Sequence, residues 1–259
     1  MKLKIPTNPS KKWLYEFLEE QYAAFNRENA VSSEFLDPLL IAREFRSEKV
    51  ALVCALFAYG NVRAILKFLE SLPLESLQDS NFNFVESQFL KPYRFQNKLD
   101  IFIFFKILSR LESLESIFMQ GYKNGGILGG IANLQNAFYD GLESLGIKAT
   151  QGLEFLLGKK ITKDSTSPLK RWNLFLRWMV RNDFLDLGLW SGINRADLLL
   201  PLDTHTFRVT QRLGLLARKS YDFKAVCEVS ESLRRFDKND PIKYDFALYR
   251  IGQLGLVEL

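Results

Sequence analysis

Lys170 and Asp203 are the residues whose chemical types and expected positions best suit a reaction on a bound substrate. Ser167-Pro168 predicts a helix start, which would place Lys170 at the third helical position, where the helix dipole disfavours a cation. Arg171 adds like-charge repulsion, and both effects favour the neutral amine that can act as a nucleophile. The plainer alternative is a surface lysine whose stem bends away from the helix.

Asp203 follows an apolar stretch, residues 199–202, that delivers the chain from the interior. Its place before Thr204 predicts an N-cap at the start of a helix over residues 204–213. A carboxylate that accepts backbone N–H bonds is held ionised and fixed, so it could stabilise positive charge developing on a sugar ring. The structural alternative is a cap alone, worth about 1 kcal/mol.

Two more residues of this segment are accessory candidates. His205 is the single histidine of the chain and could act as a general base, although a lone histidine is more often packed or bonded to backbone. Arg208 follows one helical turn later. The expected site is therefore a catalytic pair, Lys170 and Asp203, with His205 and Arg208 as accessory residues.

Basic residues are concentrated around the helix that Lys170 is expected to join. Between Lys159 and Arg181 there are seven of them against one acid, Asp164. A phosphate backbone would be attracted to such a surface, and free N–H groups at a helix start also favour anions. A solvated helix face is the usual alternative. The expected nucleic-acid contacts are Lys159, Lys160, Lys163, Arg171 and Arg177.

Helices are the elements that must position these residues. Apolar side chains recur at helical spacing in almost every long segment, for example from Trp13 to Tyr22. Asp37-Pro38 predicts a helix over residues 39–45, and Ser47-Glu48 a buried helix over residues 50–59. β-Branched residues are sparse, and no Asn-Gly or Asp-Gly turn joins alternating runs. We therefore predict an all-α fold with short connections.

Composition excludes several classes of protein. One histidine and two cysteines among 259 residues exclude a multi-histidine metal site and a four-thiolate cluster. The cysteines favour a reducing compartment, so we expect a cytoplasmic protein. No apolar run reaches the ~20 residues of a membrane span, so no membrane partner is expected. The net charge of +5 is compatible with a polyanionic partner.

The residues around Asp203 resemble a known signature. Residues 202–209, Leu-Asp-Thr-His-Thr-Phe-Arg-Val, resemble the Val-Asp-Thr-His-x-x-Arg-Val motif of the helix–hairpin–helix (HhH-GPD) DNA glycosylase superfamily. The motif aspartate of that superfamily is its catalytic carboxylate, and in bifunctional members an upstream lysine forms a Schiff base. The resemblance implies these roles for Asp203 and Lys170. Their long separation is similar to that in archaeal 8-oxoguanine glycosylases.

A second resemblance covers most of the chain. The chain resembles DUF2400, a bacterial family of conserved proteins without assigned function. The similar segments are residues 170–181, 201–203 and 240–248, together with Ala58-Tyr59-Gly60 and Tyr93-Arg94-Phe95. The glycosylase resemblance adds that the segment of residues 57–63 lies where relatives place the residues that probe the gap in the duplex. It gives Tyr59, Asn61 and Arg63 as lesion-probing candidates, although Tyr59 could equally be part of the core.

The implied architecture is a two-lobed helical fold with a cleft between the lobes. Residues 31–150 would form a central helical bundle, and residues 1–30 with 151–259 the lobe that carries the motif. The superfamily has a hairpin with a Gly-x-Gly sequence, which lets backbone amides approach a DNA phosphate. In this chain, Gly158-Lys159-Lys160 and a Ser/Thr stretch stand in place of that sequence. Cationic side chains would have to replace backbone amides in gripping phosphate. The usual C-terminal cysteine cluster is also missing, so no cofactor is expected.

The function implied by the resemblance is DNA repair by base excision, with AP-lyase activity through a Schiff-base lysine. The implied partner is double-stranded DNA with a damaged base, and we expect a monomer. The sequence does not distinguish DNA from RNA, and it does not name the base. A helical nucleic-acid-binding or scaffold protein without catalysis is the main alternative, because a shared fold does not transfer function. A small-molecule enzyme is a third.

Overall fold

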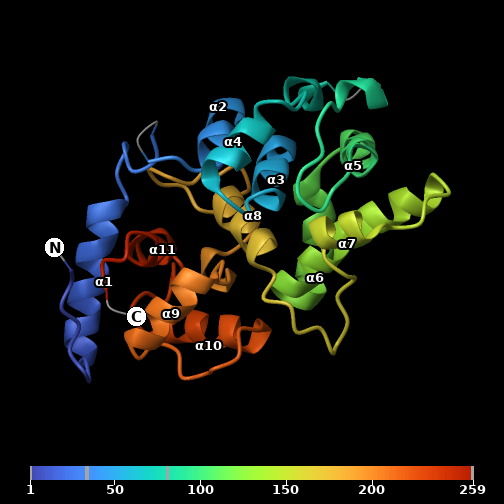
Figure 1. Ribbon diagram of the computed structural model, residues 1–259. Helices are drawn as coiled ribbons and strands as arrows, with labels where there is room; N and C mark the ends of the chain where they lie inside the picture. Colours follow the sequence, from blue (N-terminus) through green and yellow to red (C-terminus); the bar gives the residue numbers. More distant parts are fainter. Residues whose placement is uncertain (1, 33–34, 80–81, 258–259) are drawn as a thin grey trace. The chain divides into compact units, whose positions relative to one another are not determined.

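The computed structural model describes residues 2–32, 35–79 and 82–257, and their regular structure is helical (Figure 1). Within these ranges the chain forms eleven α-helices and three short 3-10 helices, and no strand is present. Two isolated bridges, Tyr93–Gln96 and Asn182–Leu187, supply the β-type pairing. The prediction of an all-α fold is confirmed. In the same ranges, no helix is both long and apolar enough to cross a membrane.

The chain divides into two compact units, one formed by Met1–Ala30 with Ser165–Leu259 and the other by Val31–Asp164. We call them the terminal unit and the central unit. The boundary expected from the sequence lay at residue 150, whereas α7 (Gln151–Leu157) groups with the central unit. There α7 packs against α5, and the carbonyl of Gly152 accepts a hydrogen bond from the Gln96 side chain at 2.7 Å.

The central unit contains one helix, α3 (Glu48–Leu56), that is buried along almost its whole length. Its elements are α2 (Leu39–Phe45), α3 (Glu48–Leu56), α4 (Val62–Leu69), η1 (Glu75–Gln78), η2 (Glu86–Gln88), α5 (Lys98–Arg110), α6 (Leu114–Ser144) and α7. Every residue of α3 from Val50 to Leu56 is fully buried. Its N-terminal end is polar and paired: Glu48 accepts backbone bonds from the start of α6, and Lys49 donates to the Ser109 carbonyl.

Glycines let α6 fold back on itself. Helical structure continues on both sides of Gly126, the one residue inside α6 that leaves the helical conformation, with φ +58°. A Cβ on Gly121 would lie 2.1 Å from the carbonyl oxygen of Gly129. The two arms therefore touch through their backbones, which only residues without a side chain permit.

The terminal unit holds the predicted catalytic pair. Its helices are α1 (Lys11–Phe25), α8 (Lys170–Val180), η3 (Arg195–Asp197), α9 (Thr204–Arg212), α10 (Phe223–Arg234) and α11 (Asp245–Gln253). Helix α11 packs against both α9 and α1. Helix α8 is anchored by Trp172, Phe175 and Trp178, each at most 3% exposed. Burial of each such side chain stabilises the fold by about 2–3 kcal/mol, so α8 is a rigid support for what lies at its ends.

Candidate active site

Lys170 and Asp203 lie side by side in the terminal unit, although they are far apart in the sequence. The Lys170 Nζ atom is 3.8 Å from Asp203 Oδ2, a separation typical of an ion pair rather than a tight hydrogen bond. The lysine side chain is 31% exposed and the aspartate side chain 11%. The amine can thus be reached from solvent while the carboxylate that faces it is mostly sheltered.

Asp203 is held by the helix it starts. It is the N-cap of α9, as its position in the sequence predicts, and its Oδ1 accepts a hydrogen bond from the Thr206 N–H at 2.7 Å. The two carboxylate oxygens therefore have different partners, because Oδ1 binds the backbone and Oδ2 faces Lys170. Capping by Oδ1 fixes the direction of Oδ2 without occupying it.

Lys170 is the first residue of α8 and not the third, which corrects the position expected from Ser167-Pro168. The helix begins late because Leu169 takes a left-handed conformation, with φ 50° and ψ 31°. Such a conformation costs a residue with a Cβ about 1–2 kcal/mol. Strained residues of this kind are frequent beside functional sites, and this one sets the direction in which Lys170 leaves the backbone.

Tyr221 supports the residue that precedes Asp203. Its hydroxyl donates a hydrogen bond to the Leu202 carbonyl at 2.7 Å, and its ring meets Phe207 edge-on. Burial, with a further contribution from the Asp203 charge, raises the pKa of Tyr221 to about 12. The phenol therefore stays protonated at neutral pH, so it remains a donor that pins the chain where α9 begins.

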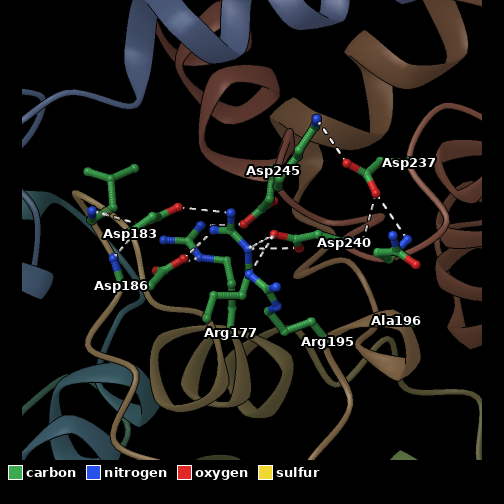
Figure 2. A network of polar contacts seen from close by, with 12 residues as sticks. Arg177, Asp183, Asp186, Arg195, Ala196, Asp237, Asp240 and Asp245 are labelled. Atoms are coloured by element: carbon green, nitrogen blue, oxygen red, sulfur yellow. Dashed lines mark hydrogen bonds and ion pairs between the residues drawn. The ribbon is translucent and has the colours of Figure 1, made fainter.

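Arg177 is not available to nucleic acid, which corrects the expected set of phosphate contacts. It lies about two turns after Lys170 on α8, is 3% exposed, and its guanidinium binds Asp186 and Asp245 (Figure 2). Its Nε and Nη1 donors are therefore bound to carboxylates inside the protein. Arg177 therefore supports the terminal unit from within.

Arg181 extends the same buried network. It pairs with Asp186, with Asp183 at 2.8 Å and with Asp240 at 2.9 Å. We call these residues the arginine–aspartate network: Arg177, Arg181, Asp183, Asp186, Asp240 and Asp245. Its four acids were not predicted as functional residues. Two of them follow α8 directly in the sequence, so an acidic stretch beside the basic one was the available signal.

Asp245 connects this network with the catalytic pair. It is the first residue of α11 and is 3% exposed, and its Oδ2 binds Arg177. Among the residues that the structure describes, Asp245 Oδ1 has no hydrogen-bond partner. Burial raises the pKa of Asp245 to about 6; Arg177 opposes this, and the charge of Asp203 adds to it. The terminal unit therefore contains a second carboxylate that senses the charge of Asp203.

Replacing Asp245 with asparagine should change how stability depends on pH. Because its pKa is raised from 3.8 to about 6 in the folded protein, the folded state keeps a proton that the unfolded state releases. The stability that this gives is present below pH ~4 and is lost as the pH rises through about 6. Between pH 4 and pH 7, the free energy of unfolding of the wild type, measured in urea, should fall by up to about 3 kcal/mol more than that of Asp245→Asn. Parallel pH curves would contradict this assignment.

The accessory candidates lie on the exposed part of α9. His205 and Arg208 are both exposed, and the His205 ring meets Tyr249 edge-on with centroids 6.5 Å apart. A Cβ on Gly252 would lie 2.8 Å from the Cβ of His205, so α11 approaches closely there. His205 therefore packs against α11, whereas Asp203, the N-cap of the same helix, faces Lys170.

The other basic candidates are divided between the units. Lys159, Lys160 and Lys163 are exposed residues of the central unit after α7, and Lys160 Nζ lies 5.3 Å from the centroid of the Tyr139 ring. Arg171 is half-buried on α8 in the terminal unit. The cations that the sequence gathered around one helix start therefore belong to two different units.

The lesion-probing candidates lie around the start of α4 in the central unit. Asn61 is the N-cap of α4 and accepts backbone bonds from Arg63 and Ala64. Arg63 is exposed in the first turn. Tyr59 is half-buried, its hydroxyl pairs with Gln96, and its ring packs among other aromatic rings. Tyr59 is thus mainly part of the packing of the central unit.

No metal centre is evident at the pair or elsewhere in residues 2–32, 35–79 and 82–257, where no group of three or more His, Cys, Asp or Glu side chains could hold an ion.

Comparison with models of known protein families matches residues 37–254 to the family described as "Protein of unknown function (DUF2400)". Both members of the catalytic pair and all six network residues lie inside the matched range. Comparisons with curated proteins and with solved structures found no match.

Proposed function

The chain belongs to the DUF2400 family of proteins of unknown function, and from its Lys170–Asp203 pair we propose a base-excision DNA glycosylase with AP-lyase activity. The observation that carries the proposal is a reachable amine 3.8 Å from a carboxylate fixed by its own helix. An amine nucleophile beside an oriented acid is the arrangement that covalent catalysis at a sugar carbon needs. The proposal includes the two-lobed HhH-GPD fold and a cytoplasmic monomer.

The proposed reaction starts with a base that has left the stack. Unstacking it costs a few kcal/mol, least for a damaged or mismatched base. The Lys170 amine, after giving its proton to solvent, attacks C1′ of the sugar. As the new N–C1′ bond forms, the C1′–N bond to the base breaks, and the base leaves with the electron pair and takes up a proton. The Asp203 carboxylate stabilises the positive charge that develops on the sugar.

The second stage is strand cleavage. Opening of the sugar ring converts the Lys170 adduct into a Schiff base, which makes a proton on C2′ acidic. Loss of that proton expels the 3′-phosphate by β-elimination, and water then releases the lysine. Exposed cations, among them Lys159, Lys160 and Lys163, would hold the phosphate backbone in place of the missing glycine hairpin.

Borohydride trapping tests the proposal directly. The protein is incubated with duplexes that carry 8-oxoguanine, uracil, alkylated bases or an abasic site, and borohydride is then added to reduce any Schiff base. We expect a covalent adduct with at least one substrate, and its loss in Lys170→Gln, because glutamine has no nucleophilic amine. Electrophoresis under denaturing conditions measures the adduct.

The matched control is Lys12→Gln. Lys12 Nζ is also 3.8 Å from a carboxylate, that of Glu16, and belongs to the same unit, but the pair is exposed on α1. This variant should form the adduct as the wild type does. If DNA binds but no substrate of the panel gives an adduct or free base, the glycosylase proposal is wrong and a non-catalytic nucleic-acid-binding protein remains.

A further inference from the structure

A rigid turn of the central unit presents two residues to solvent. Tyr93 and Gln96 exchange backbone hydrogen bonds of 2.9 Å in both directions, which closes the turn. The ends of the turn are fixed inside the unit, because the Tyr93 hydroxyl donates to the Tyr59 carbonyl and the Gln96 amide donates to the Gly152 carbonyl. Gln96 itself is 1% exposed. The residues between these anchors, Arg94 and Phe95, are both exposed.

The tip of this turn belongs to an aromatic cluster that is open to solvent. Phe95 is 56% exposed and Phe155 is 40% exposed, and their ring centroids are 4.3 Å apart. The Tyr59 ring stacks with Phe95 at 6.4 Å and meets Phe155 edge-on at 5.0 Å. The Arg94 guanidinium lies 5.9 Å from the centroid of Tyr59 and 5.8 Å from that of Phe95. We call Tyr59, Arg94, Phe95 and Phe155 the aromatic turn.

The conformation of the aromatic turn is unfavourable for the isolated protein. Arg94 has φ 50°, a left-handed conformation that costs a residue with a side chain about 1–2 kcal/mol. A Cβ on Gly60 would lie 2.8 Å from Arg94 Nη1, so the guanidinium lies directly against that backbone. The chain therefore holds a cation in place beside two exposed rings. The strained conformation of Arg94 leaves the Phe95 and Phe155 rings exposed, so it is not explained by burial of these side chains. Backbone strain of this kind is frequent where a ligand binds.

The chemistry of the aromatic turn fits a flat, electron-rich ligand that carries negative charge. Exposed aromatic faces stack nucleobases of any sequence, and a guanidinium adds both stacking and attraction to phosphate. Two further exposed cations belong to adjoining segments: Arg63 in the first turn of α4, and Lys98 at the start of α5. The positive charge favours a polyanion over an apolar peptide.

We propose that the aromatic turn is a stacking site for an unpaired base of a single-stranded nucleic acid. This stacking site goes beyond the proposed glycosylase activity, because stacking needs neither the Lys170 amine nor the Asp203 carboxylate. All four residues of the site belong to the central unit, whereas the catalytic pair belongs to the terminal unit. The two proposals can therefore stand or fail separately.

The test measures binding of the full-length protein to a fluorescein-labelled oligothymidylate of about 12 nucleotides by fluorescence anisotropy. Phe95→Ala and Phe155→Ala should each raise Kd by about 5- to 150-fold, which corresponds to 1–3 kcal/mol per stacked base. Phe95→Trp keeps an aromatic face and should bind within about twofold of the wild type. Phe95→Leu keeps apolar surface without that face and should bind as weakly as Phe95→Ala.

Phe184→Ala is the matched control, since Phe184 is an equally exposed phenylalanine (60%) of the terminal unit and should have no effect. Repeating the titrations in the Lys170→Gln background separates this site from the catalytic pair, and the same differences are expected there. Wild-type affinity in Phe95→Ala would overturn the proposal. Wild-type affinity in Phe95→Leu would also overturn it and would indicate an apolar docking surface for a protein. A wild type that does not bind the oligonucleotide would overturn it as well.

Discussion

Asparagine in place of Asp203 should slow base release by about 10²- to 10³-fold while the protein remains folded. The substitution removes the negative charge that faces Lys170 but keeps an oxygen that can accept the Thr206 N–H bond. Asparagine caps a helix about as well as aspartate, so α9 should begin at the same residue. Single-turnover kinetics on a substrate found in the trapping panel measures the rate, and urea unfolding measures the stability.

The control for this substitution is Asp222→Asn. Asp222 is the N-cap of α10 in the same unit and accepts a hydrogen bond from the Ala225 N–H at 3.0 Å, but its charge pairs with Arg218. Loss of its charge should leave the rate of base release unchanged. If both variants release the base at the wild-type rate, the Asp203 carboxylate serves only as a helix cap.

Features that depend on a few neighbouring residues could be predicted from the sequence. Asp37-Pro38 predicted a helix over residues 39–45, and α2 has those limits. Asp203 was predicted as an N-cap for the same kind of reason, because capping is a bond between a side chain and the backbone three residues later. The start of α8 could not be predicted in this way, since it depends on the left-handed conformation of Leu169, a residue type with no preference for it.

The role of Arg177 could not be predicted from local charge. Counting basic residues does not tell whether a cation faces solvent or buried acids, and its partner Asp245 lies far along the chain. The burial of α8 was the better signal. Every residue from Phe175 to Val180 is buried, so that part of the helix has no solvated face on which a cation could meet phosphate. The pairing of Lys170 with Asp203 likewise came from a family resemblance, because spacing in the sequence does not fix distance in space.

The arginine–aspartate network and the catalytic pair share one helix, and the charge of Asp203 acts on Asp245, an acid of the network. Helix α8 carries Lys170 at its first residue and Arg177 further along the same helix. Asp245 receives a hydrogen bond from Arg177, and the charge of Asp203 contributes to its raised pKa. Removing Arg177 would therefore affect both the stability of the terminal unit and the charge near the catalytic pair.

Arg177→Met should lower the free energy of unfolding by about 3–5 kcal/mol, the usual loss when one partner of a buried ion pair is removed. Methionine fills much of the same volume, so the effect comes mainly from Asp186 and Asp245, which would stay buried without their cation. Urea unfolding followed by circular dichroism measures the change. Arg177→Lys should also destabilise the protein, because a single ammonium does not reproduce the planar fork that binds two carboxylates.

Two control variants separate the effect of burial on stability from the effect of ion pairing. They are Arg218→Met and the double variant Arg177→Met/Asp245→Asn. Arg218 also pairs with an aspartate in the terminal unit, but its side chain is 33% exposed, so water can replace the lost partner and stability should change little. The double variant removes the charge of one stranded acid, so it should recover part of the stability that Arg177→Met loses. A loss below about 1 kcal/mol in Arg177→Met would contradict the buried network, because it would mean that water reaches the two carboxylates.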